Sequence, residues 1–129
     1  MLASAKRDLK ALSNMLDGEC FDDEVFGFHA QQAAEKALKA WLNVLSKTYP
    51  FTHDLGRLLH DLDQAGAEVQ AHWTLLDLTS YAVRFRYGSA SVDDDPLDRT
   101  ALLDDIRSLI AHVSGMVDHP SDGANAGDD

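Results

Sequence analysis

Apolar residues recur at helical spacing in five successive segments, and this periodicity is the feature that most constrains the fold. No segment alternates apolar and polar residues in the way that a half-buried strand does. We expect helices over about 2–16, 21–48, 52–65 and 68–87, and a fifth that begins at 95–96. Five helices joined by short loops predict an all-α protein, an up-and-down bundle of four to five helices.

Residue types that start or stop helices separate these segments. The predicted stops are Asp17-Gly18, Pro50, Gly66 and Gly88, and the predicted starts are Asp22 or Asp23, Thr52 and Asp95-Pro96. Asp95 followed by Pro96 is typical of a helix start, because proline fits the first helical position.

The fifth segment presents one apolar face before the composition changes. That face consists of Leu102, Ile106, Leu109, Ile110, Val113 and Val117. The last residues, "DHPSDGANAGDD" (118–129), are small, polar and acidic, which is typical of a disordered tail. We therefore expect one helical domain over 1–117 and an acidic tail over 118–129.

The chain is strongly acidic. It has 22 acidic and 11 basic residues among 129, for a formal net charge of −11. Binding to nucleic acid through a broad basic surface depends on neutralising phosphates, so this charge argues against it. Any anion site is therefore a local pocket and not a whole face of the protein.

The sequence predicts a protein of the reducing interior of the cell. No apolar run approaches the roughly 20 residues that a membrane span needs, and "MLASAKRDLK" is too polar for a signal peptide. Cys20 is the single cysteine, which excludes an intramolecular disulfide and a cysteine-based metal site. We expect a cytoplasmic protein with no membrane contact.

The second predicted helix divides into a wide apolar arc and a narrow polar stripe. The arc contains Phe26, Ala30, Ala33, Ala34, Ala37, Leu38, Trp41 and Leu45. The stripe contains His29, Gln32, Lys36, Lys39 and Asn43. Glu35 and Lys39 have the i, i+4 spacing and order that favour an ion pair. The stripe is either a solvated face or a line of donors suited to a phosphate or a partner.

The two arginines of "TSYAVRFRYGS" (79–89) differ in predicted direction. Arg86 falls on the edge of the apolar face of its helix, whereas Arg84 points roughly the opposite way. An inward guanidinium stays charged, so Arg86 needs a carboxylate, a carbonyl or a bound anion. A salt bridge and an anion site both remain open. Tyr81 and Tyr87 nearby either stack on a base or pack with their hydroxyls in water.

Other kinds of site have little support in the sequence. The six histidines are His29, His53, His60, His72, His112 and His119. They form no HExxH motif and no tight ligand cluster, and the chain has no glycine-rich phosphate loop. We expect no metal and no cofactor. The loop "GSASVDDD" (88–95) is either a plain connector or a functional loop.

Four stretches, taken in order, make the sequence similar to the HEPN ("higher eukaryotes and prokaryotes nucleotide-binding") domain family. They are "AKRDLKAL" (5–12), "FGFHAQQAAEKALKAWL" (26–42), "THDLGRLL" (52–59) and "YAVRFRYG" (81–88). The resemblance covers residues 1 to about 117 and implies a bundle of four or five helices, usually assembled as a homodimer. Many small members are encoded beside a minimal nucleotidyltransferase, and the pair can act as a toxin–antitoxin module.

The resemblance also implies which residues bind. The matching positions are Gln32, Glu35, Lys36, Lys39, His53, Asp54, Arg86 and Tyr87. A large subset of the family are metal-independent RNases with an R-x4–6-H motif near the end of the fourth helix, and Arg86 is the best match to its arginine. The next histidine is His112, far outside the required spacing, so the RNase motif is incomplete.

Three hypotheses follow. The first is a homodimeric HEPN module that partners a minimal nucleotidyltransferase and binds a nucleotide or RNA phosphate. Its binding residues are Arg86, Tyr87, Lys36, Gln32, Lys39 and His53. The second is an endoribonuclease in which Arg86 acts with His53 as a displaced base. The third is a structural dimerisation module, in which Arg86 pairs with Glu35 or Asp54. We expect binding and not cleavage.

Overall fold

Every regular element of the described chain is a helix. The computed structural model describes residues 1–17, 20–77 and 98–118. Its elements are α1 (Leu2–Ser13), α2 (Asp23–Val44), α3 (Leu55–Gln64), the 3-10 helix η1 (Gln70–Asp77) and α5 (Arg99–Asp118). The predicted all-α class is confirmed.

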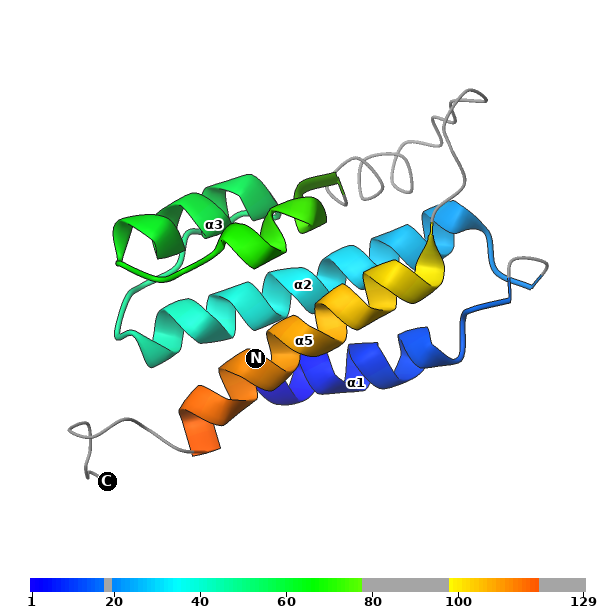
Figure 1. The fold of residues 1–129 in the computed structure, drawn as a ribbon, viewed down its shortest axis with the longest axis horizontal. Helices are drawn as coiled ribbons and strands as arrows, with labels where there is room; N and C mark the ends of the chain where they lie inside the picture. Colours follow the sequence, from blue (N-terminus) through cyan, green and yellow to red (C-terminus); the bar gives the residue numbers. More distant parts are fainter. Residues whose placement is uncertain (18–19, 78–97, 119–129) are drawn as a thin grey trace.

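α2 is the central helix of the bundle. Figure 1 shows α2 between α3 with η1 on one side and α5 with α1 on the other, and α5 passing obliquely in front of α1. α2 packs against α1, α3 and α5, while α5 also contacts α1 and η1. Side chains on α2 therefore meet most of the other described elements.

The core consists of the apolar faces of these helices. Its largest fully buried side chains are Leu12, Phe26, Leu38, Leu42, Leu55, Leu58, Leu59, Leu62, Leu75, Ile106 and Leu109. The predicted apolar faces differ from the structure at their ends. Leu45 is only half-buried, and Val117 is 49% exposed because the last turn of α5 extends past the start of α1 (Figure 1).

α1 is shorter than the predicted segment. It ends at Ser13 and not at Leu16. The Ser13 hydroxyl and the Asn14 amide both donate to the Lys10 carbonyl, at 2.7 and 3.2 Å. Side chains that take helix carbonyls in this way compete with the backbone, which explains the early end.

α2 also ends before the predicted stop at Pro50. Ser46 has a φ of 62°, and this left-handed residue closes the helix after Val44. The Ser46 N–H donates to the Asn43 carbonyl, and the Lys47 N–H donates to the Leu42 carbonyl at 2.9 Å. This pair of hydrogen bonds is the Schellman motif, for which glycine is the usual left-handed residue.

α3 starts at Leu55 and ends as predicted before Gly66, whose φ is 91°. The predicted cap at Thr52 is wrong, because Asp54 is the residue whose carboxylate accepts the Gly56 N–H, at 2.9 Å. Thr52 instead accepts the Asp54 N–H through its hydroxyl, at 3.0 Å. Thr52 therefore orders the turn that leads into the helix.

The fourth and fifth segments lie partly outside the described residues. η1 is a 3-10 helix where an α-helix over 68–87 is predicted, and residues 78–97, with Asp95-Pro96, are outside the description. α5 begins at Arg99, where the Asp98 carboxylate accepts the Ala101 N–H at 3.1 Å. α5 reaches Asp118, and residues 119–129 of the predicted tail lie outside the described residues.

Arg99 connects the start of α5 to the loop between α1 and α2. It is buried, and its guanidinium donates to the carbonyls of Met15 at 2.7 Å and of Phe21. It also forms an ion pair with Asp23 at 2.9 Å. Because a guanidinium stays charged, its burial requires these acceptors.

No helix in the described ranges combines the length and the hydropathy that a membrane crossing requires.

Candidate functional site

Polar side chains at positions 31, 35 and 39 form a row along α2. Because they are four residues apart, they lie on the same face of the helix. Gln31 is fully buried, and Glu35 and Lys39 are each 5% exposed. A buried charge without a partner is costly, so each of these groups needs one.

Glu35 is the centre of this row. Its Oε2 accepts a hydrogen bond from Lys39 Nζ at 2.9 Å, and its Oε1 accepts one from Gln31 Nε2 at 3.1 Å. His53 Nδ1 lies 2.9 Å from the same Oε1. Gln32 Nε2 donates to Gln31 Oε1 at 3.0 Å. We call Gln31, Gln32, Glu35, Lys39 and His53 the Glu35 network.

His53 reaches the network from the loop between α2 and α3. Gln31 Nε2 donates to the His53 backbone carbonyl at 2.8 Å, which fixes the loop beside α2. The His53 side chain is 54% exposed, whereas that of Glu35 is 7% exposed. One edge of the imidazole is therefore held by a buried carboxylate while much of the ring faces solvent.

The neighbours of Glu35 keep it ionised. Burial by itself raises the pKa of Glu35, but hydrogen bonds from Lys39 and His53, the Lys39 charge and the Gln31 amide outweigh burial, and the pKa lies below its ordinary value. An ionised carboxylate only accepts hydrogen bonds, so His53 Nδ1 carries the proton. In the neutral imidazole Nε2 is then the acceptor.

A comparison with models of known protein families gives a match. The model of the HEPN domain family matches residues 1–116, which is most of the chain. The chain belongs to the HEPN domain family. No curated protein and no solved structure matches this HEPN domain significantly.

Lys36 does not join the Glu35 network of the HEPN domain. Its Nζ is 2.8 Å from both the Asp8 carboxylate and the Ser4 hydroxyl, so it connects α2 to α1. Lys39 Nζ, besides its ion pair, lies 5.5 Å from the centre of the Tyr49 ring. The predicted binding roles of Lys36 and Lys39 stay predictions.

Arg86 and Tyr87, the other predicted binding residues, lie outside the described residues, as do Arg84, Tyr81 and the loop 88–95. The hypothesis that Arg86 pairs with Glu35 or Asp54 therefore stays a prediction. Both carboxylates already have partners in the structure, since Glu35 holds Lys39 and Asp54 caps α3.

The predicted polar stripe of α2 is not uniform in the structure. His29 is half-buried and Asn43 is exposed, but Lys39 is buried, so a fully solvated face is wrong at that position. The i, i+4 pair of Glu35 and Lys39 is confirmed at 2.9 Å. Gln31 is the member that sequence reasoning missed, although its spacing of four from Glu35 is a usable signal.

Two more histidines lie against Trp41, where α2, η1 and α5 meet. The Trp41 ring contacts His72 and His112, with ring centres 5.7 and 4.8 Å apart, and the two imidazole centres are 6.5 Å apart. Burial has the largest effect on the pKa of His72 and lowers it, and the neighbouring His112 lowers it further. The nearby Asp105 carboxylate acts in the opposite direction and raises this pKa. We call Trp41, His72 and His112 the Trp41 cluster.

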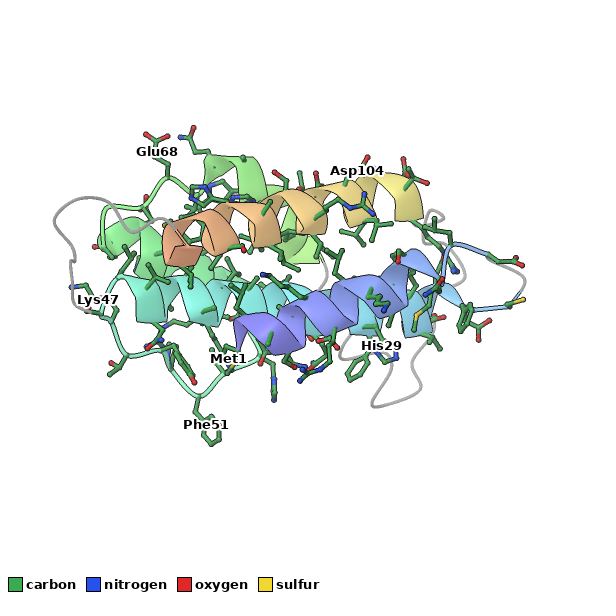
Figure 2. All side chains as sticks on the ribbon, turned by 90° about the horizontal axis from the view of Figure 1, so that it is seen from below. Met1, His29, Lys47, Phe51, Glu68 and Asp104 are labelled. Carbon is green, nitrogen blue, oxygen red and sulfur yellow. The ribbon has the colours of Figure 1, made fainter. Side chains whose placement is uncertain are left out.

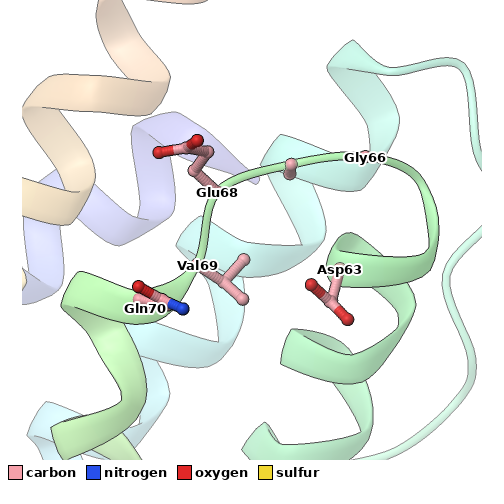
Figure 3. A pocket seen from close by; sticks show the side chains of 6 residues that line it. Asp63, Gly66, Glu68, Val69 and Gln70 are labelled. Carbon is pink, nitrogen blue, oxygen red and sulfur yellow. The ribbon is translucent and has the colours of Figure 1, made fainter.

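The remaining side-chain clusters and pockets of the described residues are weaker candidates for a functional site. Within the described ranges, no set of three or more His, Cys, Asp or Glu side chains is placed to hold a metal ion. A pocket of about 290 Å³ lies at the turn between α3 and η1, and Asp63, Glu68, Val69 and Gln70 are among the residues that line it (Figure 3). Its charged side chains are carboxylates, which do not suit a phosphate.

Proposed function

We propose that this HEPN domain binds the phosphate of a nucleotide or of RNA at His53, with Arg86 as a second anion-binding group. The observation that carries the proposal is the 2.9 Å contact between His53 Nδ1 and the buried Glu35 carboxylate. This contact holds a half-exposed imidazole in one orientation. Its Nε2 has no partner among the described residues, and in the imidazolium form this nitrogen carries a proton that it can donate to a phosphate oxygen.

Arg86 enters the proposal from the sequence. A guanidinium binds phosphate oxygens with two parallel hydrogen bonds and keeps its charge at any physiological pH. The acidic chain as a whole repels polyanions, so binding depends on a few local donors such as these. Tyr87 is proposed as a neighbouring contact on the same ligand.

We also propose that the domain forms a homodimer and acts with a minimal nucleotidyltransferase in a toxin–antitoxin-like pair. The family resemblance supports both parts of this proposal. Light scattering on the purified protein tests the dimer, which requires a mass of about twice the 14.2 kDa chain. Co-expression with the product of a neighbouring nucleotidyltransferase gene, followed by co-purification, tests the partner.

The phosphate site is tested by fluorescence anisotropy with a short labelled single-stranded RNA. His53→Ala and Arg86→Ala each lose one charged or polar contact, and we expect each to weaken binding about 10-fold. His60→Ala removes an exposed histidine of α3 and serves as the matched control. Unchanged affinity in both test variants, with circular dichroism showing them folded, would overturn the site.

RNA cleavage is the second candidate function, and the same histidine favours it. With Nδ1 protonated toward Glu35, His53 Nε2 is available to take the proton of a 2′-hydroxyl. The 2′-oxygen then bonds to the adjacent phosphorus, the bond to the 5′-oxygen breaks, and the imidazolium returns a proton to that oxygen. Arg86 would stabilise the charge on the phosphorus centre.

Incubation with purified total RNA, read on a denaturing gel, separates the two candidates. Cleavage by the wild type that is lost in His53→Ala supports the RNase. Cleavage that persists in His53→Ala removes that residue from the mechanism. Absence of cleavage, combined with RNA binding that depends on His53, leaves the binding module.

A further inference from the structure

Phe51 is the most exposed large apolar side chain of the described residues. Its exposure is 104%, and the next value is 51%, at Met1. Figure 2 shows the Phe51 ring projecting away from the body of the protein. Single exposed apolar residues are common on protein surfaces, so the exposure of Phe51 gains meaning only from the groups around it.

Two hydrogen bonds fix the backbone at Phe51 and just after it. The Thr52 N–H donates to the Pro50 carbonyl at 2.9 Å, which closes a three-residue turn with Phe51 at its centre. Two residues later, Gln31 holds the His53 carbonyl at 2.8 Å. The turn fixes the backbone at Phe51, and the Gln31 hydrogen bond holds the loop against α2 two residues later, so the ring projects from a segment with fixed backbone contacts.

The second half of α2 and the loop that carries Phe51 differ in charge from the rest of the chain. Residues 36–53 contain three lysines, one histidine and no acid, although the chain has 22 acids among 129 residues. Lys36 and Lys39 are paired with Asp8 and Glu35. Lys47 is exposed and has no ion pair with a described residue. An aromatic ring and a basic side chain on one exposed loop are groups of the kind that bind single-stranded nucleic acid.

We infer that Phe51 stacks on a base of single-stranded RNA whose phosphate contacts His53. The inference rests on the proposed phosphate site and adds the group that recognises the base. Two residues span at most about 7 Å of extended chain, so the ring and the imidazole can meet parts of the same short stretch of RNA. Stacking on an aromatic ring is tolerant of base identity, so we expect little sequence preference.

Anisotropy with two oligonucleotides of equal length tests the inference. One is an ordinary single-stranded RNA, and the other has the same sugar-phosphate backbone without bases. Phe51→Ala is expected to weaken binding of the ordinary RNA at least 5-fold and to leave binding of the abasic strand unchanged. Phe51→Trp is expected to keep the affinity, and its added fluorescence should be quenched by the ordinary RNA. Leu16→Ala, at a 43% exposed residue, is the control for loss of an exposed apolar side chain.

Each of the other possible results would overturn a named part of the inference. Full affinity in Phe51→Ala, with binding that still depends on His53, overturns stacking and leaves the phosphate site. Full affinity in Phe51→Leu also overturns stacking, because a plain apolar contact then suffices. A changed mass in light scattering with unchanged RNA affinity assigns Phe51 to contact with a second copy. No RNA binding by the wild type overturns the phosphate site and stacking together.

Discussion

The Glu35 network and the Trp41 cluster each bury a titratable side chain, and folding lowers the pKa of both, but it favours the charged form of Glu35 and the neutral form of His72. For Glu35, burial is outweighed by donors and a cation, so the carboxylate stays charged. For His72, burial and a second imidazole act in the same direction, so the ring stays neutral. The neighbours, and not burial alone, decide which form a buried group adopts.

The largest expected effect is at the centre of the Glu35 network. Glu35→Ala leaves Lys39 buried without its partner, and we expect a loss of about 3–5 kcal/mol in the free energy of unfolding. Urea denaturation at neutral pH measures it. The double variant Glu35→Leu with Lys39→Met removes both charges and should recover most of the loss. A loss below about 1 kcal/mol in Glu35→Ala would show that the pair is unimportant to stability.

The pH dependence of unfolding separates the two regions. Because both pKa values are lowered by folding, each group stabilises the fold above its ordinary pKa and loses that contribution as the pH falls through its folded value. The His72 contribution declines below about pH 6.5, and the Glu35 contribution declines below about pH 4.3. Urea denaturation across this range should show two separate declines.

His72→Gln tests the assignment of the first decline. The variant cannot become charged, so the decline below about pH 6.5 should disappear while the acid decline remains. The groups around His72 are Trp41 of α2 and His112 and Asp105 of α5. An unchanged pH profile would assign the first decline to another histidine.

A smaller effect is expected at the second ion pair of α2. Lys36 and Asp8 have side chains that are 27% and 23% exposed, whereas those of Lys39 and Glu35 are 6% and 7% exposed. Lys36→Met should therefore lower the free energy of unfolding by no more than about 1 kcal/mol. An ion pair that water reaches is only slightly more stable than its two separated ions, because water already solvates both. A loss of stability in Lys36→Met as large as in Glu35→Ala would show that burial does not set the strength of these two ion pairs.

The smallest stability effect is expected at His112, which is exposed on α5. His112→Ala should change the free energy of unfolding by no more than about 0.5 kcal/mol at neutral pH. It should nevertheless raise the pKa of His72, because it removes a neighbouring positive charge. The NMR chemical shifts of the His72 ring protons, followed across pH, measure this pKa. The same His72 pKa in the variant and the wild type would contradict the proposed effect of His112.

Local signals in the sequence predict much of the fold. Gly66 is the usual left-handed residue of a helix end, and α3 ends there as expected. Ser46 performs the same role for α2, but serine carries no such signal, so the predicted helix is too long. The 3-10 geometry of η1 is likewise not distinguished from an α-helix by apolar spacing.

The candidate site is predicted only in part, because its contacts span different distances along the chain. Glu35 and Lys39 are one turn apart, and their pairing follows from spacing. His53 joins Glu35 across 18 residues, a contact that depends on how the loop after α2 folds back. Arg99 was missed because most of its acceptors are backbone carbonyls, which every residue has.

The contacts of Arg99 have a consequence for the order in which the protein acquires its structure during synthesis. The guanidinium holds the carbonyl of Met15, which precedes it by 84 residues. At typical translation rates the ribosome needs about 4 to 17 seconds to add that length of chain. The segment of α1 and α2 is therefore synthesised before Arg99. Until Arg99 is added, the carbonyls of the loop between α1 and α2 have water in place of the guanidinium as their donor.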